Sequence, residues 1–215
     1  MAAPATELDL EQRLRAGLEA MRIEAQPGLV RDCSRLLRLL DKWNRAFNLT
    51  AVRDPAEMVA RHILDSLSAR PFLTGLSVLD VGTGAGFPGL PLAIAEPQRH
   101  FTLLDSGGKK IRFVRHVIGE LALDNVIVEQ LRVEAFEPAD LYDVVISRAF
   151  SSLGGFVRRC GRLVATGGSL LAMKGKYPDT ELSGVPAAWD VADVVGLVVP
   201  GQVGERHMVI MRRSG

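Results

Sequence analysis

The stretch Val78–Gly89, which reads V-L-D-V-G-T-G-A-G-F-P-G, constrains the fold of this 215-residue chain more than any other feature. A short apolar run contains a carboxylate, Asp80, and three glycines follow closely at Gly82, Gly84 and Gly86. Glycine permits positive φ angles and lets the backbone approach a ligand closely. The pattern therefore predicts a buried strand that turns sharply into a helix, with free N–H groups facing a polar ligand.

Two kinds of nucleotide-like cofactor fit this turn. Gly84, Gly86 and Gly89 match the G-x-G-x-x-G pattern of dinucleotide sites, and Asp105 lies near the distance expected of a ribose-binding acid. Two features favour S-adenosylmethionine. Asp80 stands where a carboxylate would hold the α-ammonium group of that cofactor and would repel a pyrophosphate. The chain is also too short for two βαβαβ halves and a separate catalytic domain. For Asp80 alone, satisfaction by N–H groups of the turn is the alternative.

After Pro71 the sequence alternates between strand and helix patterns. Fully apolar strands predict a parallel sheet that is covered on both faces. Only a turn near residues 200–204 separates the last two strands, so we expect them to pair as an antiparallel edge hairpin. The prediction is an α/β, Rossmann-like fold with a seven-stranded, mostly parallel sheet. The expected strands are Val78–Val81, Phe101–Asp105, Val126–Leu131, Tyr142–Ser147, Ser169–Met173, Ala192–Val199 and His207–Arg212.

The first 70 residues have helical periodicity, so we expect an N-terminal helical extension over 1–70 and a cofactor-binding domain over 71–215. The extension should contain helices over Leu8–Met21, Pro27–Phe47 and from Asp54 to about Leu67. In the third helix, Arg61 and Asp65 are spaced to form an ion pair, and His62 shares a face with Ser66. We expect these side chains to pair structurally rather than to form a catalytic triad.

One face of the second predicted helix is basic. Like charges at i,i+3 and i,i+4 repel one another, so such a stripe is tolerated best when an anion neutralises it. We therefore expect contacts with an anion such as a nucleic-acid phosphate, with a merely solvated face as the alternative. Further cations follow the second and fifth strands. The predicted RNA-binding residues are Arg31, Arg35, Arg38, Lys42, Arg45, Lys109, Lys110 and Lys174.

In an open α/β sheet, the residues that follow each strand lie beside the ligand. Asp105 follows the second strand, where its carboxylate can accept hydrogen bonds from both ribose hydroxyls. Val133 and Glu134 follow the third, where a backbone N–H and a side-chain acceptor would read the adenine edge. An exposed loop acid is the alternative for Glu134. Together with Phe87 and Arg148, these residues complete the expected cofactor site.

The sequence after the fourth strand, Ser147-Arg148-Ala149, limits the chemistry. An N-P-P-Y loop for amine methylation and a cysteine nucleophile for pyrimidine carbon are both missing from this position. Arg148 suits a nucleophile that needs no activation, such as guanine N7, so positioning supplies the rate and no general base is expected. Arg148 should hold the methionine carboxylate, a phosphate or guanine O6 alone. A structural ion pair is its alternative role.

The composition, 24% charged and 47% hydrophobic, is that of a globular protein. No apolar run reaches the length of a membrane span, and no signal-peptide pattern begins the chain, so we expect a cytoplasmic protein. Cys33 and Cys160 stand alone, so no metal site or disulfide is expected. We expect a monomer.

Taken in order, the motifs of the chain resemble the RsmG (GidB) family, bacterial 16S rRNA guanine-N7 methyltransferases. The resemblance spans nearly the whole chain. It implies a class I methyltransferase fold that binds S-adenosylmethionine and an N-terminal helical extension. It also implies methylation of guanine N7 at nucleotide 527 of 16S rRNA in the small ribosomal subunit, and cofactor roles for Gly82, Phe87, Val133 with Glu134, and Arg148. The sequence departs from the family pattern at Gly107-Gly108, which leaves the roles of Lys109 and Lys110 open. The motifs are Trp43–Thr50, Arg61–Ser66, Leu79–Gly89, Thr102–Ser106, Ser147–Ala149 and Gly204–His207.

Other functions remain open at this point. The first is a class I methyltransferase that acts on another RNA or on a protein. The second is an RNA-binding protein that only senses the cofactor, which the intact set of predicted cofactor residues opposes. The third is a nicotinamide oxidoreductase, which tight NADH binding without S-adenosylhomocysteine binding would establish.

Overall fold

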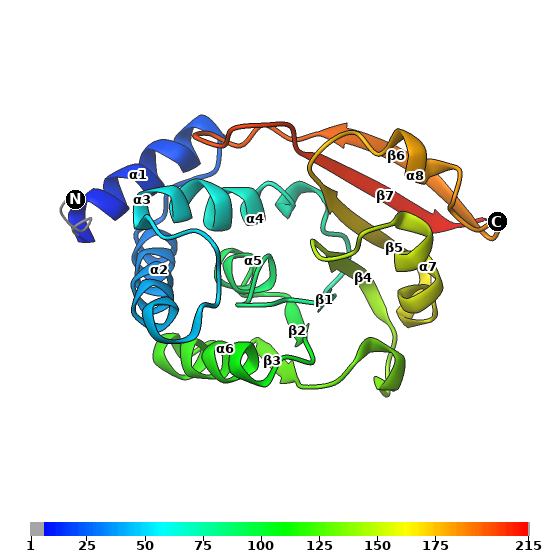
Figure 1. Ribbon diagram of the computed structural model, residues 1–215, viewed down its shortest axis with the longest axis horizontal. Coiled ribbons are helices and arrows are strands. Elements are labelled where there is room, and N and C mark those ends of the chain that lie inside the picture. The colour runs from blue at the N-terminus through cyan, green and yellow to red at the C-terminus, as the bar shows by residue number, and fades with distance from the viewer. Residues whose placement is uncertain (1–6, 215) are drawn as a thin grey trace.

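Seven strands form one sheet, in the order β3-β2-β1-β4-β5-β7-β6 (Figure 1). The computed structural model describes residues 7–214. The first five strands pair in parallel, and β7 pairs antiparallel with both β5 and β6. The predicted mostly parallel sheet with an antiparallel edge hairpin is therefore confirmed. The strands are β1 (Ser77–Val81), β2 (His100–Leu104), β3 (Val126–Glu129), β4 (Tyr142–Ser147), β5 (Val164–Lys174), β6 (Trp189–Gly196) and β7 (His207–Arg213).

The main error in the predicted strand ends concerns β5, which begins at Val164 rather than at Ser169. The intervening residues A-T-G-G have no strand periodicity of their own. Pairing with β4 extends the strand there, since Tyr142 lies opposite Val164 before the register shifts ahead of Val144. Tertiary pairing thus overrides a weak local preference.

Side chains of each strand point alternately to two apolar cores, as the period of a strand requires. On β4, Val144 belongs to the core beneath helices α5 (Gly89–Ala95) and α6 (Gly108–Leu121). Its neighbour Val145 belongs to the core beneath α7 (Leu153–Cys160) and the 3₁₀ turns η3 (Val133–Ala135) and η4 (Gly161–Leu163). Both faces of the sheet are covered, as predicted.

Of the N-terminal helices, α2 (Pro27–Phe47) packs outside α5 and α6, and α1 (Glu7–Ala20) packs on α2 and on the helical segment 55–64 (Figure 1). The predicted bounds of α2 are confirmed, and Asn48 ends the helix in a left-handed conformation. Buried leucines of α1 and α2, such as Leu14 and Leu36, belong to the same core as one face of the sheet. The proposed division at residue 70 therefore cuts through a shared core.

The third predicted helix consists of three continuous segments: α3 (Pro55–Met58), a π-helical turn η1 (Val59–Leu64) and α4 (Asp65–Leu67). Asp54 caps its start by accepting the N–H of Ala56. In the π turn, the N–H of Asp65 donates to the carbonyl oxygen of Ala60, five residues earlier. A π turn is rare and often occurs at functional sites. The short 3₁₀ turn η2 (Arg70–Phe72) and helix α8 (Asp179–Leu182) complete the helices.

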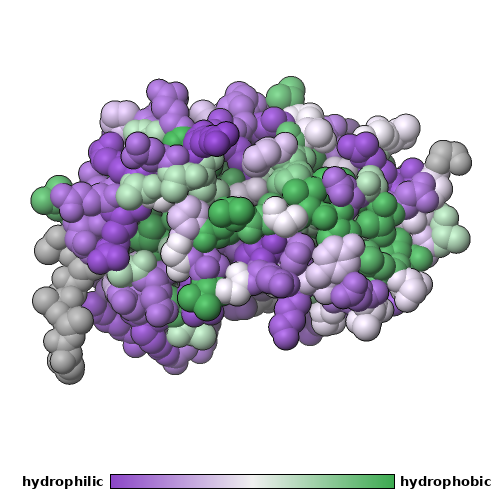
Figure 2. Space-filling model, turned by 90° about the horizontal axis from the view of Figure 1, so that it is seen from above, coloured by the Kyte–Doolittle hydropathy of each residue, from purple (hydrophilic) through white to green (hydrophobic). Residues whose placement is uncertain are grey.

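Seen from above, the surface mixes hydrophilic and apolar residues, with apolar residues gathered across the middle and to the right (Figure 2). Within residues 7–214, no helix combines the length and the apolar character needed to cross a membrane. Among the same residues, no group of three or more His, Cys, Asp or Glu side chains is placed to hold a metal ion.

Candidate functional site

The Gly-rich turn follows β1 at the carboxyl edge of the sheet. Strand order reverses between β1 and β4, which is where ligands bind in open α/β sheets. Gly82, Gly84 and Gly86 all have positive φ angles, of 72°, 61° and 90°. The N–H of Gly82 donates to the carbonyl oxygen of Leu104 at 2.8 Å, which ties the turn to the end of β2. The glycines therefore occupy conformations that other residues adopt only with strain.

Asp80 is buried beneath this turn and accepts hydrogen bonds from it. Its Oδ2 accepts the hydroxyl of Thr83 at 2.6 Å and the N–H of Gly89 at 2.9 Å. Its other oxygen, Oδ1, is buried and accepts no hydrogen bond from any residue in 7–214. Burial raises the pKa of Asp80 to about 6, against the opposing effect of its hydrogen bonds. Oδ2 thus has the structural role, whereas Oδ1 is left without a partner among the described residues of the fold.

Asp105 connects the Gly-rich turn to the start of α6. Its Oδ2 accepts the N–H of Gly84 at 2.9 Å, and its Oδ1 accepts the N–H of Gly107 at 2.7 Å. A carboxylate has about four lone-pair sites, so each oxygen keeps capacity for a further donor. Asp105 also lines a cavity of about 280 Å³ at this edge, which we call the cofactor cavity.

The cofactor cavity brings together residues from three strand ends. Gly82 follows β1, Asp105 follows β2, and Val133 and Glu134 follow β3. The side chain of Glu134 is about half exposed, and its carboxylate lies 3.4 Å from the guanidinium of Arg159. Glu134 therefore forms a surface ion pair as well as part of the cavity wall. Adjacent donors and acceptors in a concave site are what orient a polar ligand.

These residues fit S-adenosylmethionine. The cavity has room for part of a nucleoside, and Asp105 offers free lone pairs to ribose hydroxyls. The unpartnered Oδ1 of Asp80 lies beneath the same turn, but Asp80 is fully buried and does not line the cofactor cavity. Phe87 lies on the turn but is buried and does not line the cofactor cavity.

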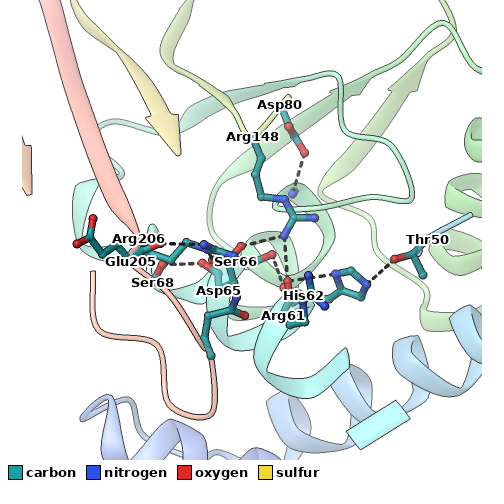
Figure 3. Close-up of polar contacts among 12 residues, drawn as sticks. Thr50, Arg61, His62, Asp65, Ser66, Ser68, Asp80, Arg148, Glu205 and Arg206 are labelled. Atoms are coloured by element: carbon teal, nitrogen blue, oxygen red, sulfur yellow. Dashed lines mark hydrogen bonds and ion pairs between the residues drawn. The ribbon is translucent and has the colours of Figure 1, made fainter. Parts of the chain in front are cut away.

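Arg148 lies at the end of β4, and its guanidinium forms an ion pair with Asp65 (Figure 3). From the sequence, such a structural ion pair is only the alternative role of Arg148. Its Nη1 donates to Asp65 Oδ2 at 2.9 Å and to the carbonyl oxygen of Arg61 at 3.1 Å. Arg206 donates from Nε to the other oxygen of Asp65 at 3.0 Å. We call Asp65, Arg148 and Arg206 the Asp65 network. Arg148 also lies over the ring of Phe87, with its guanidinium carbon 5.7 Å from the ring centroid.

The predicted ion pair between Arg61 and Asp65 is wrong. Arg61 instead lies 3.8 Å from Glu57, four residues earlier. The reason is burial and competition, because Asp65 is buried with its two oxygens bound by Arg148 and Arg206, whereas the side chain of Arg61 is half exposed.

His62 is buried against the Gly-rich turn, and its ring pairs with Thr50, whereas the hydroxyl of Ser66 donates to the carbonyl oxygen of His62. Its ring stacks on Phe87 with centroids 4.7 Å apart. Nδ1 lies 3.1 Å from the carbonyl oxygen of Arg61, so Nδ1 carries the proton, and Nε2 accepts the hydroxyl of Thr50 at 3.0 Å. Burial and the charge of Arg148 lower the pKa of His62 to about 4. The imidazole is therefore neutral and both of its nitrogens are occupied.

The basic stripe on α2 is neutralised within the protein, which removes the argument from self-repulsion. Four carboxylates pair with its arginines, at 2.8 Å for Arg31 and 2.6 Å for Arg35 and Arg45. Lys42 is exposed. RNA contact by the stripe stays a prediction. The pairs are Arg31 with Asp32, Arg35 with Glu120, Arg38 with Glu7 and Arg45 with Asp41.

The other predicted RNA-binding lysines differ in exposure and in whether they are already paired. Lys109 and Lys110 are exposed at the start of α6. The Lys110 ammonium lies beside the Gly-rich turn, since a Cβ atom added to Gly84 would be 4.0 Å from it. Lys174 is mostly buried, and its ammonium donates to the carbonyl oxygen of Phe150 and pairs with Glu181 at 2.7 Å. A phosphate would have to compete with that carboxylate.

Sequence reasoning missed Arg206 and Thr50 as members of the site. Both belong to motifs that the sequence displays, G-E-R-H and W-N-R-A-F-N-L-T, but neither motif indicates a partner by its spacing. The partners lie far away along the chain, 141 residues in the case of Arg206 and Asp65.

Comparisons with known proteins agree with this geometry. A family model described as rRNA small subunit methyltransferase G matches residues 30–209. A ribosomal RNA small subunit methyltransferase G from Hahella chejuensis is 47% identical over 208 residues, covering 97% of this chain and 96% of the relative. One from Marinobacter nauticus is 48% identical over 202 residues, covering 94% of each.

Solved structures establish the fold. The N-methyltransferase NodS from Bradyrhizobium japonicum, in complex with S-adenosyl-L-homocysteine, aligns with a TM-score of 0.58 at 13% identity, covering 81% of this chain and all of that one. The mitomycin 7-O-methyltransferase MmcR aligns with a TM-score of 0.62 at 15% identity, covering all of this chain and 74% of that one. The predicted class I methyltransferase fold is confirmed. By its family model and its relatives, the chain belongs to the rRNA small subunit methyltransferase G family, the RsmG (GidB) family that its motifs resemble.

Proposed function

We propose that this protein transfers a methyl group from S-adenosylmethionine to N7 of one guanine of 16S rRNA, nucleotide 527, in the small ribosomal subunit. The observation that carries the proposal is the cofactor cavity, where Gly82, Asp105 and Glu134 converge beside a turn whose Asp80 keeps one unpartnered oxygen. Membership of the family supplies the substrate class. The protein would act in the cytoplasm as a monomer.

Residues of the cofactor cavity, together with Asp80 beneath the neighbouring turn, would hold the cofactor, which supplies an electrophilic methyl group on its sulfonium. Asp105 binds the ribose hydroxyls, while its two existing hydrogen bonds keep the carboxylate in place. Asp80 binds the α-ammonium through Oδ1. Val133 and Glu134 bind the adenine. Charge-assisted hydrogen bonds of this kind are the strong ones, so the two aspartates should dominate affinity.

Neither His62 nor either cysteine is available as a general base, which fits a nucleophile that needs none. His62 is neutral, but both ring nitrogens are hydrogen-bonded and its pKa is about 4. Burial raises the pKa of Cys160 to about 12 and that of Cys33 still further, and both thiols lie in the cores. Guanine N7 has a free lone pair in the ring plane, so methyl transfer requires alignment rather than proton removal.

Arg148 is best placed to align the substrate, because it connects the Asp65 network to Phe87 of the Gly-rich turn. Its bond to Asp65 fixes the guanidinium, which is a positioning role and requires no change of protonation. Single-turnover methylation should therefore be nearly flat with pH between about 6 and 8 once cofactor is saturating. An acidic limb with a slope of one that disappears in His62→Gln would contradict this and would place the N7 assignment in doubt.

The direct test uses small ribosomal subunits from cells that lack this protein, together with labelled S-adenosylmethionine. We expect label in 16S rRNA only, as 7-methylguanosine, at a single position that chemical cleavage at the modified base maps to nucleotide 527. Asp105→Ala is the matched inactive protein. Label in another RNA or in a ribosomal protein would replace this proposal with the alternative, a class I methyltransferase of different substrate.

A further inference from the structure

A second cavity, of about 380 Å³, lies beside the Asp65 network. We call it the arginine cavity. Its wall contains Thr50 and His62 from the N-terminal region, Arg148 from the end of β4, Lys174 from the end of β5 and Arg206 from the turn before β7. No residue of the Gly-rich turn, 82–89, lines it. Arg148 borders this cavity, and the following residue, Ala149, lines the cofactor cavity, so the end of β4 separates the two.

The arginine cavity has an excess of positive charge. Asp65 is the one carboxylate between two guanidinium groups, since its Oδ1 binds Arg206 and its Oδ2 binds Arg148. Lys174 is already neutralised by Glu181, and His62 is uncharged. Four cations line the cavity, Arg61, Arg148, Lys174 and Arg206, against the single lining carboxylate of Asp65, whose side chain is only 3% exposed. From outside the wall, Glu57 pairs with Arg61, and buried Asp80 interacts with Arg148 from the side of the Gly-rich turn. A wall with this excess of cations favours a bound anion.

Arg206 keeps hydrogen-bond donors for such an anion. Its Nε is bound to Asp65 and its Nη1 to the carbonyl oxygen of Glu205 (Figure 3). Its Nη2 makes no hydrogen bond to any residue in the described range, 7–214. A guanidinium has five N–H groups in a rigid fork that matches phosphate oxygens. The bond to Asp65 holds that fork in one orientation at the cavity wall.

We propose that the arginine cavity binds a phosphodiester group of the RNA strand beside the target guanosine, with Arg206 as the phosphate ligand. The inference rests on the proposed function for its source of phosphate. Arg148 joins the cavity to the Gly-rich turn through Phe87, so a phosphate bound there would lie close to the cofactor site. Phosphate contacts fix the register of a nucleic acid without reading its sequence. The cavity would thus determine which nucleotide reaches the methyl donor.

The methionine carboxylate of the cofactor is the other anion near this edge. The geometry favours RNA, because the arginine cavity is not lined by the Gly-rich turn, whereas the cofactor cavity contains Gly82. The two sources predict different effects of the same substitution, so one pair of binding measurements separates them.

The test compares Arg206→Gln with Arg206→Lys and with the control Arg212→Gln, an exposed arginine on the adjoining β7 with the same change of charge. Arg206→Lys keeps the charge for Asp65 but loses the fork, so it should fold like wild type while binding RNA less tightly. We measure binding to 16S rRNA over a range of salt, S-adenosylhomocysteine affinity by calorimetry, and melting temperature. Arg206→Gln should weaken RNA binding by roughly 10- to 100-fold, as expected for lost charge-assisted hydrogen bonds.

For Arg206→Gln we also expect a salt slope lower by about 0.7 to 0.9, with S-adenosylhomocysteine affinity unchanged. Lower cofactor affinity with RNA binding unchanged would overturn the inference and assign the cavity to the methionine carboxylate. A lower melting temperature alone, in both Arg206 variants, would also overturn it, because the network would then be only structural. Wild-type protein that binds 16S rRNA but methylates no subunit would refute the proposed chemistry and leave this binding comparison valid.

Discussion

Asp105 illustrates, at the scale of a residue, how one carboxylate can serve both the fold and a ligand. It accepts N–H groups from Gly84 and Gly107, and it lines the cofactor cavity. We expect Asp105→Ala to weaken S-adenosylhomocysteine binding by about 1.5 to 3 kcal/mol, through the loss of charge-assisted hydrogen bonds to the ribose. Calorimetry measures this, with the exposed Asp124→Ala as the control. Unchanged affinity in folded protein would rule out the ribose role.

His62 predicts a dependence of stability on pH. Its pKa is lowered to about 4 in the fold and is near 6.5 in an unfolded chain, so the unfolded state binds more protons between these values. The stability contributed by neutral His62 is thus fully present above pH 6.5 and is lost as the pH falls toward 4. Asp80, with its pKa raised to about 6, acts in the opposite direction between about pH 4 and 6.

Comparison of wild type with His62→Gln isolates the histidine, because both proteins contain Asp80. The free energy of unfolding lost by the substitution should be smaller at pH 4.5 than at pH 7, by about 2 to 3 kcal/mol. Urea denaturation at the two pH values measures it. An equal loss at both would mean that His62 titrates normally in the folded protein.

At the scale of elements, the Asp65 network connects the third helix, the end of β4 and the turn before β7. Asp65→Ala leaves two partly covered guanidinium groups without their carboxylate. We expect a loss of about 2 to 4 kcal/mol in the free energy of unfolding, somewhat below the range for fully buried pairs because both arginines keep some exposure. A double-mutant cycle with Arg148→Ala should be strongly non-additive. Additive losses would show that the ion pair contributes nothing to stability.

The elements also show what the sequence can predict. The Gly-rich turn and the alternation of strands and helices are local patterns, and the bounds of α2 and β4 follow from them directly. Asp105 and Glu134 follow strand ends, so the topology brings them together. The Asp65 network could not be predicted, because both arginines that bind Asp65 come from distant segments, 83 residues away for Arg148 and 141 for Arg206. Contacts between distant segments depend on packing, which no local pattern records.

At the scale of the whole molecule, α2 runs from the amino end of the sheet toward its ligand-binding edge. Arg35 pairs with Glu120 near the end of α6, whereas Trp43 contacts Phe113 nearer its start. Because α6 begins at the carboxyl edge of β2, the last turn of α2 lies closer to the cofactor site than its first turns. The distance between the basic stripe and the cofactor site therefore decreases from Arg31 to Arg45.

Because the two ends of the stripe lie at different distances from the cofactor site, matched pairs of substitutions can test the predicted RNA contact. Lys42→Ala with Arg45→Ala should weaken 16S rRNA binding and flatten the plot of log affinity against log salt, by about 0.7 to 0.9 per lost phosphate contact. Arg31→Ala with Arg35→Ala removes the same charge at the far end and should change the slope less. S-adenosylhomocysteine affinity should stay the same in both, since neither pair touches the cofactor cavity. An equally flattened salt dependence in both pairs would extend the RNA-binding surface along all of α2. An unchanged slope in both pairs would show that the stripe is only a solvated face, whose arginines are satisfied by the four carboxylates.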